Sequence, residues 1–119
     1  MGLDMYLYNK NNEQVMYWRK ANQIRKWLVD HDIINDNDNC KERLVTYQNL
    51  KDLIEDCKKV IENPSLANKI LPTSEGFFFG GKEFDDWYFE QLKTTVKELE
   101  PILKDSDKEH DHFIYSDWW

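Results

Sequence analysis

Hydrophobic and polar residues alternate in four short segments of the chain. In LDMYLY, residues 3–8, every second residue is apolar, which is the period-two pattern of a strand with one buried face. QVMYWR at residues 14–19 predicts a second short strand, joined to the first as a hairpin by the turn-forming sequence between them. RLVTY at 43–47 and HFIYSDWW at 112–119 predict two further strands.

Apolar residues recur with a helical period in three longer segments. These segments are residues 19–31, 50–61 and about 83–102, and each predicts a helix that buries one face. Thr46 is a candidate N-cap of the second helix, since its hydroxyl can accept from an unpaired backbone amide. Pro101 lacks an amide and predicts a kink or a break near the end of the third helix.

The succession of elements predicts an α+β fold in a single domain. We expect a small, mostly antiparallel sheet packed against about three helices, and a chain of 119 residues suits one hydrophobic core. Asn63-Pro64 ends the second helix, and residues 65–70 predict a short helix after it. The glycine-rich segment 71–82 predicts a strand or a tight loop.

The chain is acidic, with a formal net charge of −7. This charge argues against general binding to nucleic acids or to anionic membranes, because phosphate contacts need a basic surface. The first residues do not have the pattern of a secretory signal, and no apolar run reaches the length of a membrane span. We therefore expect a cytoplasmic protein whose Cys40 and Cys57 stay reduced, with Cys57 buried on a helical stripe.

A local exception to the acidic charge is the stretch MYWRKANQIRKWL, residues 16–28. On one helix, Trp18, Asn22 and Arg25 would form a border row between the buried and the solvent-facing rows, with Arg19 beside it. Arginine can bind an anion in a fork while tryptophan stacks on a flat ring, so these four residues are candidate ligand-binding residues. The alternative is a solvated helix face. Burial of Trp18 and an internal ion pair of Arg25 would exclude this pocket.

The loop GFFFGGK supplies a candidate second wall for the pocket. Phe78 could stack on a ligand, and the amides after Gly80 and Gly81 could bind an anion at the start of the third helix. The alternative places the phenylalanines in the core. Asp85 and Asp86 already offer negative charge to that helix terminus and are interpreted as caps rather than acid–base residues.

The C-terminal third suggests a different kind of site. Residues 83–119 contain eleven Asp or Glu against four Lys, together with Trp87, Trp118 and Trp119. Exposed tryptophans are common at the centre of protein interfaces, so these three are candidate partner-binding residues. The alternative is that the two terminal tryptophans clasp the domain.

Catalytic and metal-binding motifs are weak in this sequence. His110 and His112 could share one side of a strand, but no third ligand is evident. Residues 34–40 resemble a calcium loop in composition but lack its glycine and distal glutamate. We expect neither a metal nor another cofactor, and no nucleophile motif indicates an enzyme.

Four segments together carry a family resemblance: MGLDMYLY, YWRKAN, LPTSEGFFFG and DDWYFEQL. They resemble a family of small proteins encoded by bacteriophages and prophages, which begin Met-Gly-Leu-Asp-Met-Tyr-Leu. The resemblance spans most of the chain and supplies no catalytic residues. It implies a non-enzymatic phage accessory protein of the host cytoplasm that counteracts a bacterial defence system.

Three mechanisms are compatible with that setting. The first is capture of a small anionic, nucleotide-like signal at the basic, aromatic helix. The second is inhibition of a host defence protein through an acidic, aromatic surface. The third is metal-dependent hydrolysis of a phosphorylated substrate, which needs clustered carboxylates. The aromatic content is also compatible with a homodimer.

Overall fold

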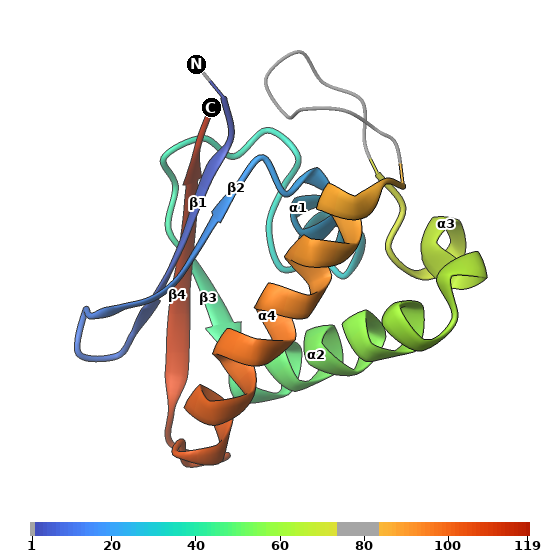
Figure 1. Ribbon diagram of the computed structural model, residues 1–119. Coiled ribbons are helices and arrows are strands. Elements are labelled where there is room, and N and C mark those ends of the chain that lie inside the picture. The colour runs from blue at the N-terminus through green and yellow to red at the C-terminus, as the bar shows by residue number, and fades with distance from the viewer. Residues whose placement is uncertain (1, 74–83) are drawn as a thin grey trace.

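The computed structural model describes residues 2–73 and 84–119 (Figure 1). Its strands are β1 (Asp4–Asn9), β2 (Gln14–Arg19), β3 (Arg43–Thr46) and β4 (His112–Trp118). Its helices are α1 (Asn22–Asp30), α2 (Tyr47–Glu62), the 3₁₀ turn η1 (Pro64–Leu66), α3 (Ala67–Ile70) and α4 (Asp86–Lys104). The α+β fold predicted from the sequence is confirmed.

The four strands form one antiparallel sheet in the order β2-β1-β4-β3. The first and last strands are therefore central neighbours, and the two ends of the chain lie side by side (Figure 1). At that end of the sheet, Asp4 is paired with Arg19 on one side and with Trp118 on the other. Three residues that are far apart in sequence thus share one row.

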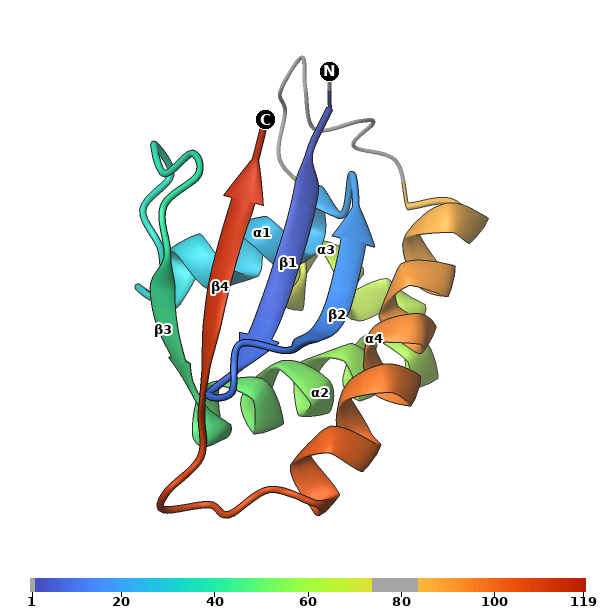
Figure 2. The ribbon, with the colours of Figure 1, turned by 90° about the vertical axis from the view of Figure 1, so that its left-hand side faces the viewer.

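The helices cover only one face of the sheet. Figure 2 views the sheet from its other face, and all the helices lie behind it. Alternate strand residues such as Met5, Leu7 and Phe113 point toward the helices and are at most 1% exposed. Burial of such side chains stabilises the fold by about 1.5–3 kcal/mol each. The opposite residues of every strand face outward from an uncovered sheet.

Side-chain caps begin two of the helices, as the sequence predicted. Thr46 caps α2, because its hydroxyl accepts from Asn49 N–H at 3.0 Å while the Asn49 side chain accepts from Thr46 N–H. Asp85 caps α4 by accepting from Tyr88 N–H at 3.0 Å. Cys57 is fully buried on α2, and burial raises the pKa of its thiol.

Two boundary predictions are wrong. The helix expected over 19–31 begins only at Asn22, because the alternating pattern of β2 continues through Arg19 and the chain then turns at Lys20 with φ of 54°. Of the kink or break expected near Pro101, the break does not occur, since α4 continues to Lys104. Pro101 removes only one amide from the hydrogen-bond ladder, and its own carbonyl still accepts from Asp105 N–H at 3.2 Å at the end of the helix.

Candidate functional site

The basic, aromatic stretch divides between a strand and a helix. Trp18 lies on the inner face of β2 and is 4% exposed, and its indole N–H donates to Thr95 Oγ1 at 2.8 Å. A buried indole needs such a partner, because an unpaired buried donor costs about 1–3 kcal/mol. Trp18 therefore joins β2 to α4 in the interior.

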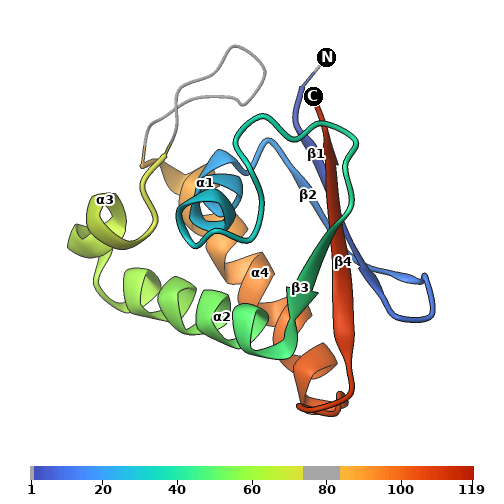
Figure 3. The same cartoon turned by 180° about the vertical axis from the view of Figure 1, so that it is seen from behind.

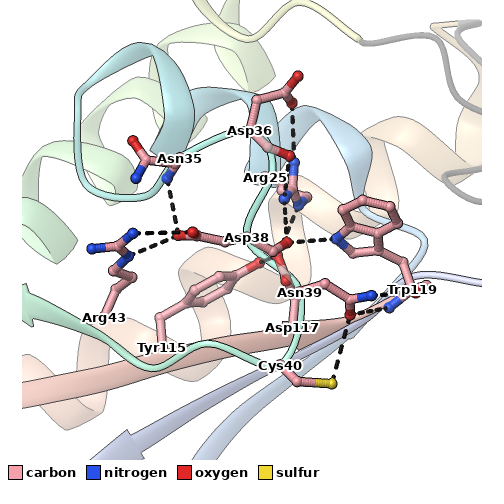
Figure 4. Close-up of polar contacts among 10 residues, drawn as sticks. All are labelled: Arg25, Asn35, Asp36, Asp38, Asn39, Cys40, Arg43, Tyr115, Asp117 and Trp119. Carbon is pink, nitrogen blue, oxygen red and sulfur yellow. Dashed lines mark hydrogen bonds and ion pairs between the residues drawn. The ribbon is translucent and has the colours of Figure 1, made fainter.

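Arg25 lies at the centre of a buried polar cluster (Figure 4). Its side chain is 2% exposed, and Nε donates to Asp117 Oδ2 at 2.8 Å. Nη2 donates to the backbone carbonyls of Asp36 and Asp38 at 3.0 and 2.9 Å, and Nη1 contacts the Asp36 carboxylate at 3.3 Å. The guanidinium is thus engaged by the protein itself.

Aromatic residues complete the cluster around Arg25. Tyr115 donates its hydroxyl to Asp117 Oδ2 at 2.7 Å, and burial raises the pKa of this phenol. Trp119 donates its indole N–H to the Asp38 carbonyl at 2.8 Å, and the Arg25 guanidinium carbon lies 5.5 Å from its ring centroid. The terminal Trp119 therefore clasps the domain.

Asp38 links the cluster to the edge strand β3. Arg43 donates to the two oxygens of the Asp38 carboxylate at 2.8 and 3.0 Å, in the bidentate geometry that is strongest for this pair. The hydrogen bonds from Arg43 lower the pKa of Asp38 from 3.8 to about 2. The cluster fixes the 34–40 segment against α1 and the sheet.

The predicted pocket at the border row is therefore wrong in its geometry. Trp18 belongs to a strand, Arg25 forms an internal ion pair, and Asn22 is 2% exposed. Trp18 and Arg25 are used by the fold, and their partners Thr95 and Asp117 come from distant segments that the local pattern does not reveal. Phe78, Gly80 and Gly81, proposed for the second wall, lie outside the described residues.

Among the predicted ligand-binding residues that the structure describes, only Arg19 faces solvent. It lines a cleft of about 320 Å³ with Gly2, Asp4, Trp118 and Trp119, at the end of the sheet where the two termini meet. The structure thereby brings a predicted ligand-binding arginine beside two predicted partner-binding tryptophans. Within the part of the chain that the structure describes, no carboxylate pairs with the Arg19 guanidinium.

The outer face of the sheet continues from this cleft as an aromatic and apolar surface. Trp118 is 61% exposed, Leu44 58% and Tyr17 41%. The Tyr6 ring lies between Tyr17 and Tyr8, with centroid distances of 5.3 and 6.4 Å. We call this surface, formed by Tyr6, Tyr8, Tyr17, Leu44, Ile114 and Trp118, the open face.

One polar contact orders the open face near the cleft. The Tyr17 hydroxyl donates to the Asp4 carboxylate across the β1–β2 pair. This hydrogen bond raises the pKa of Tyr17 to about 12, because ionisation would place two negative charges together. The tyrosine stays neutral and fixed at physiological pH.

The three tryptophans predicted to bind a partner have different environments. Trp87 is 59% exposed on α4, in the helical layer, whereas Trp118 lies on the open face and Trp119 is partly buried. The acidic residues of the C-terminal third are mostly on α4 and in the 105–111 segment. That segment precedes His112 and lies at the opposite end of β4 from Trp118. A single acidic, aromatic surface is therefore not formed around Trp118.

Metal chemistry finds no support in the described residues. Over 2–73 and 84–119, no group of three or more His, Cys, Asp or Glu side chains is placed to hold an ion. His110 precedes β4 and contacts Asp107 Oδ2 at 2.8 Å, so it does not share a strand face with His112. In those same ranges, no helix combines the length and apolar composition needed to cross a bilayer.

Comparisons with known proteins add no relative. No protein-family model matches the chain, and no curated protein or solved structure matches it significantly. The resemblance to phage proteins therefore stays a prediction, and the function must be argued from the surfaces described above.

Proposed function

We propose that this protein acts by binding a partner protein through the open face of its sheet. The observation that carries the proposal is Trp118, which is 61% exposed at the end of a sheet face that no described helix covers. Aromatic residues and arginine dominate the energetics of protein interfaces. Trp118, Tyr17 and Arg19 supply both types within one end of the sheet.

The size of the open face limits the kind of complex. Four strands about 4.8 Å apart and about 20 Å long give roughly 300–400 Å². A stable interface uses about 800 Å² per partner. The partner must therefore also contact an adjoining segment, and the cleft with Arg19 and Trp118 is the adjoining site with the best anchors.

The biological setting of this proposal comes from the sequence. Resemblance to small phage proteins supports a role in the cytoplasm of a bacterial host, where the partner would be a protein of a defence system. Inhibition by occupation of a surface needs no catalytic group, which is compatible with the described residues. The proposal thus keeps the second mechanism predicted from the sequence and moves it from an acidic surface to the open face.

A second candidate function is favoured by the composition of the cleft. Arg19 could bind the charge of a small anion while Trp118 stacks on its flat ring, as predicted for a nucleotide-like signal. The cleft volume of about 320 Å³ is at the lower end for ligand sites. The Asp4 carboxylate in the same cleft would repel an anion, so we place this candidate second.

Trp118 and Trp87 offer a matched pair for testing the proposal, since their exposed fractions are 61% and 59%. The tagged wild type, Trp118→Ala and Trp87→Ala would be isolated from cells of a bacterium that carries this gene, and their complexes compared by native mass spectrometry. We expect a partner protein that the wild type and W87A retain and W118A loses. Equal retention by all three would contradict the proposal.

The same spectra distinguish the second candidate function. A bound small mass in place of a protein, lost from an Arg19→Ala variant, would favour ligand capture in the cleft. In that case the exact mass would also give the composition of the ligand.

A further inference from the structure

A long groove runs between α2 and α4, in the helical layer of the molecule. The two helices pack against each other, and both lie on the same side of the sheet (Figures 2 and 3). The groove has a volume of about 780 Å³. It extends from Tyr47 to Lys58 along α2, which is about 16 Å or three helical turns.

The floor of the groove is apolar and its margins are basic. Ile54 and Leu103 form part of the floor and are 5% and 6% exposed. Lys51 and Lys58 line it from α2, and Lys97 and Lys104 line it from α4. Their spacing of seven residues on each helix places both pairs along one side of two helical turns.

The groove lysines differ in pairing from the other lysines on the same helices. Lys59 pairs with Asp56 at 3.7 Å and Lys93 with Glu90 at 3.8 Å, both outside the groove. Lys51, Lys97 and Lys104, in contrast, have no carboxylate within ion-pair distance in the described part of the chain. Of the six lysines on α2 and α4, the three without a pair all line the groove.

The charge balance of the groove is opposite to that of the whole protein. Its four lysines face two glutamates, Glu55 and Glu100, and Glu100 is paired with Lys58. The groove therefore has a net positive charge in a chain of formal charge −7. A positive groove on an acidic protein attracts a negatively charged partner to the groove, while the rest of the protein repels it.

We propose that this groove binds an acidic amphipathic helix of a partner protein. Apolar side chains at i, i+3 and i+4 of that helix would cover Ile54 and Leu103, and carboxylates on its flanks would pair with Lys51, Lys97 and Lys104. A length of about three turns fits the groove along α2. A nucleic acid fits less well, because its phosphate backbone offers no apolar side chains to the floor residues Ile54 and Leu103.

The groove is separate from the open face, so this inference does not depend on the proposed function. The probe for it is a stapled, fluorescein-labelled peptide of leucine and glutamate, about four helical turns long, with leucines on one face. A matched peptide has lysine in place of every glutamate. The groove variant is K51E/K97E/K104E, and the control variant K59E/K69E/K93E has the same change in charge outside the groove.

Fluorescence anisotropy and backbone amide chemical shifts give the readouts, after circular dichroism has shown that both variants are folded. We expect saturable binding of the acidic peptide to the wild type and to the control variant, with affinity about tenfold or more lower for the groove variant. Amide shifts should be confined to α2 and α4.

Four outcomes of the peptide experiments would overturn the inference. The first is the absence of saturable binding of the acidic peptide, and the second is an equal loss of its affinity in both variants. The third is equal affinity for the basic and the acidic peptide, and the fourth is amide shifts on the open face instead of the groove. Tighter binding of a single-stranded oligonucleotide than of the acidic peptide would also overturn it, in favour of a nucleic-acid site.

Discussion

Arg25 and Arg19 lie six residues apart in one basic, aromatic stretch, yet they occupy opposite environments. The Arg25 side chain is 2% exposed and donates to Asp117 and to two backbone carbonyls. Arg19 faces the cleft at the end of the sheet, beside Trp118. The first arginine holds the fold together, and the second is available to a partner.

The tryptophans show the same contrast. Trp18 is buried and donates to Thr95, whereas Trp118 is 61% exposed on the open face. Each pair consists of one side chain whose partners lie within the protein and one that faces solvent. Residue type is the same in both members of each pair, so the tertiary contacts separate the buried residue from the exposed one.

The largest effect that separates the two arginines is expected on stability. Arg25→Met should lower the free energy of unfolding by about 3–5 kcal/mol, because it leaves the buried Asp117 carboxylate without its cation. Arg19→Met should change it by no more than about 0.5 kcal/mol. Urea denaturation of both variants measures the difference, and equal losses would show that the two arginines are not distinct.

A smaller effect is expected from the buried tryptophan. Trp18→Phe should lower the free energy of unfolding by about 1–3 kcal/mol, since the hydrogen bond to Thr95 Oγ1 is lost in the interior. Trp87→Phe is the matched exposed control and should be nearly neutral. Thermal denaturation compares them, and a neutral W18F would contradict the assignment of Trp18 to the core.

The pH dependence of stability tests the Asp38–Arg43 ion pair, which belongs to the cluster around Arg25. In the folded protein the pKa of Asp38 lies at about 2, below its ordinary 3.8, so its ionised form favours folding. This contribution is complete above about pH 4 and is lost as the pH falls toward 2.

Asp38→Asn should therefore be less stable than the wild type at neutral pH, and the difference should shrink between pH 4 and pH 2. Urea denaturation over this range measures both curves. Parallel curves would indicate that Arg43 does not hold the carboxylate in solution.

The smallest effect on stability is expected on the open face. Trp118→Ala should change the free energy of unfolding by no more than about 0.5 kcal/mol, because its side chain is mostly in solvent. Differential scanning fluorimetry checks this directly. A large loss of stability would show that Trp118, like Trp119, is used by the fold.

The sequence predicted the fold class well because both periodicities are strong. The alternation in 3–8 and the apolar stripe of α2 gave the correct elements, and Thr46 was the correct cap. The border row predicted for one helix was wrong, because a turn at Lys20 separates β2 from α1. Alternation in QVMYWR continues through Arg19, so Trp18 and Arg25 do not lie on one helix.

The candidate site was less predictable, for a physical reason. Alternation places Tyr6 and Tyr8 on one side of β1, but it does not state whether a helix covers that side. Likewise, the partner of Trp18 lies 77 residues away, and that of Arg25 lies 92 residues away. These are tertiary contacts, and no local pattern encodes them.

The most direct test of the account is hydroxyl-radical footprinting of the protein in the complex isolated from cells, compared with the free protein. The account predicts that oxidation of Trp118 and Tyr17 falls in the complex while that of Trp87 is unchanged. Equal oxidation of Trp118 in the free and bound states would contradict the claim that the open face is the binding surface.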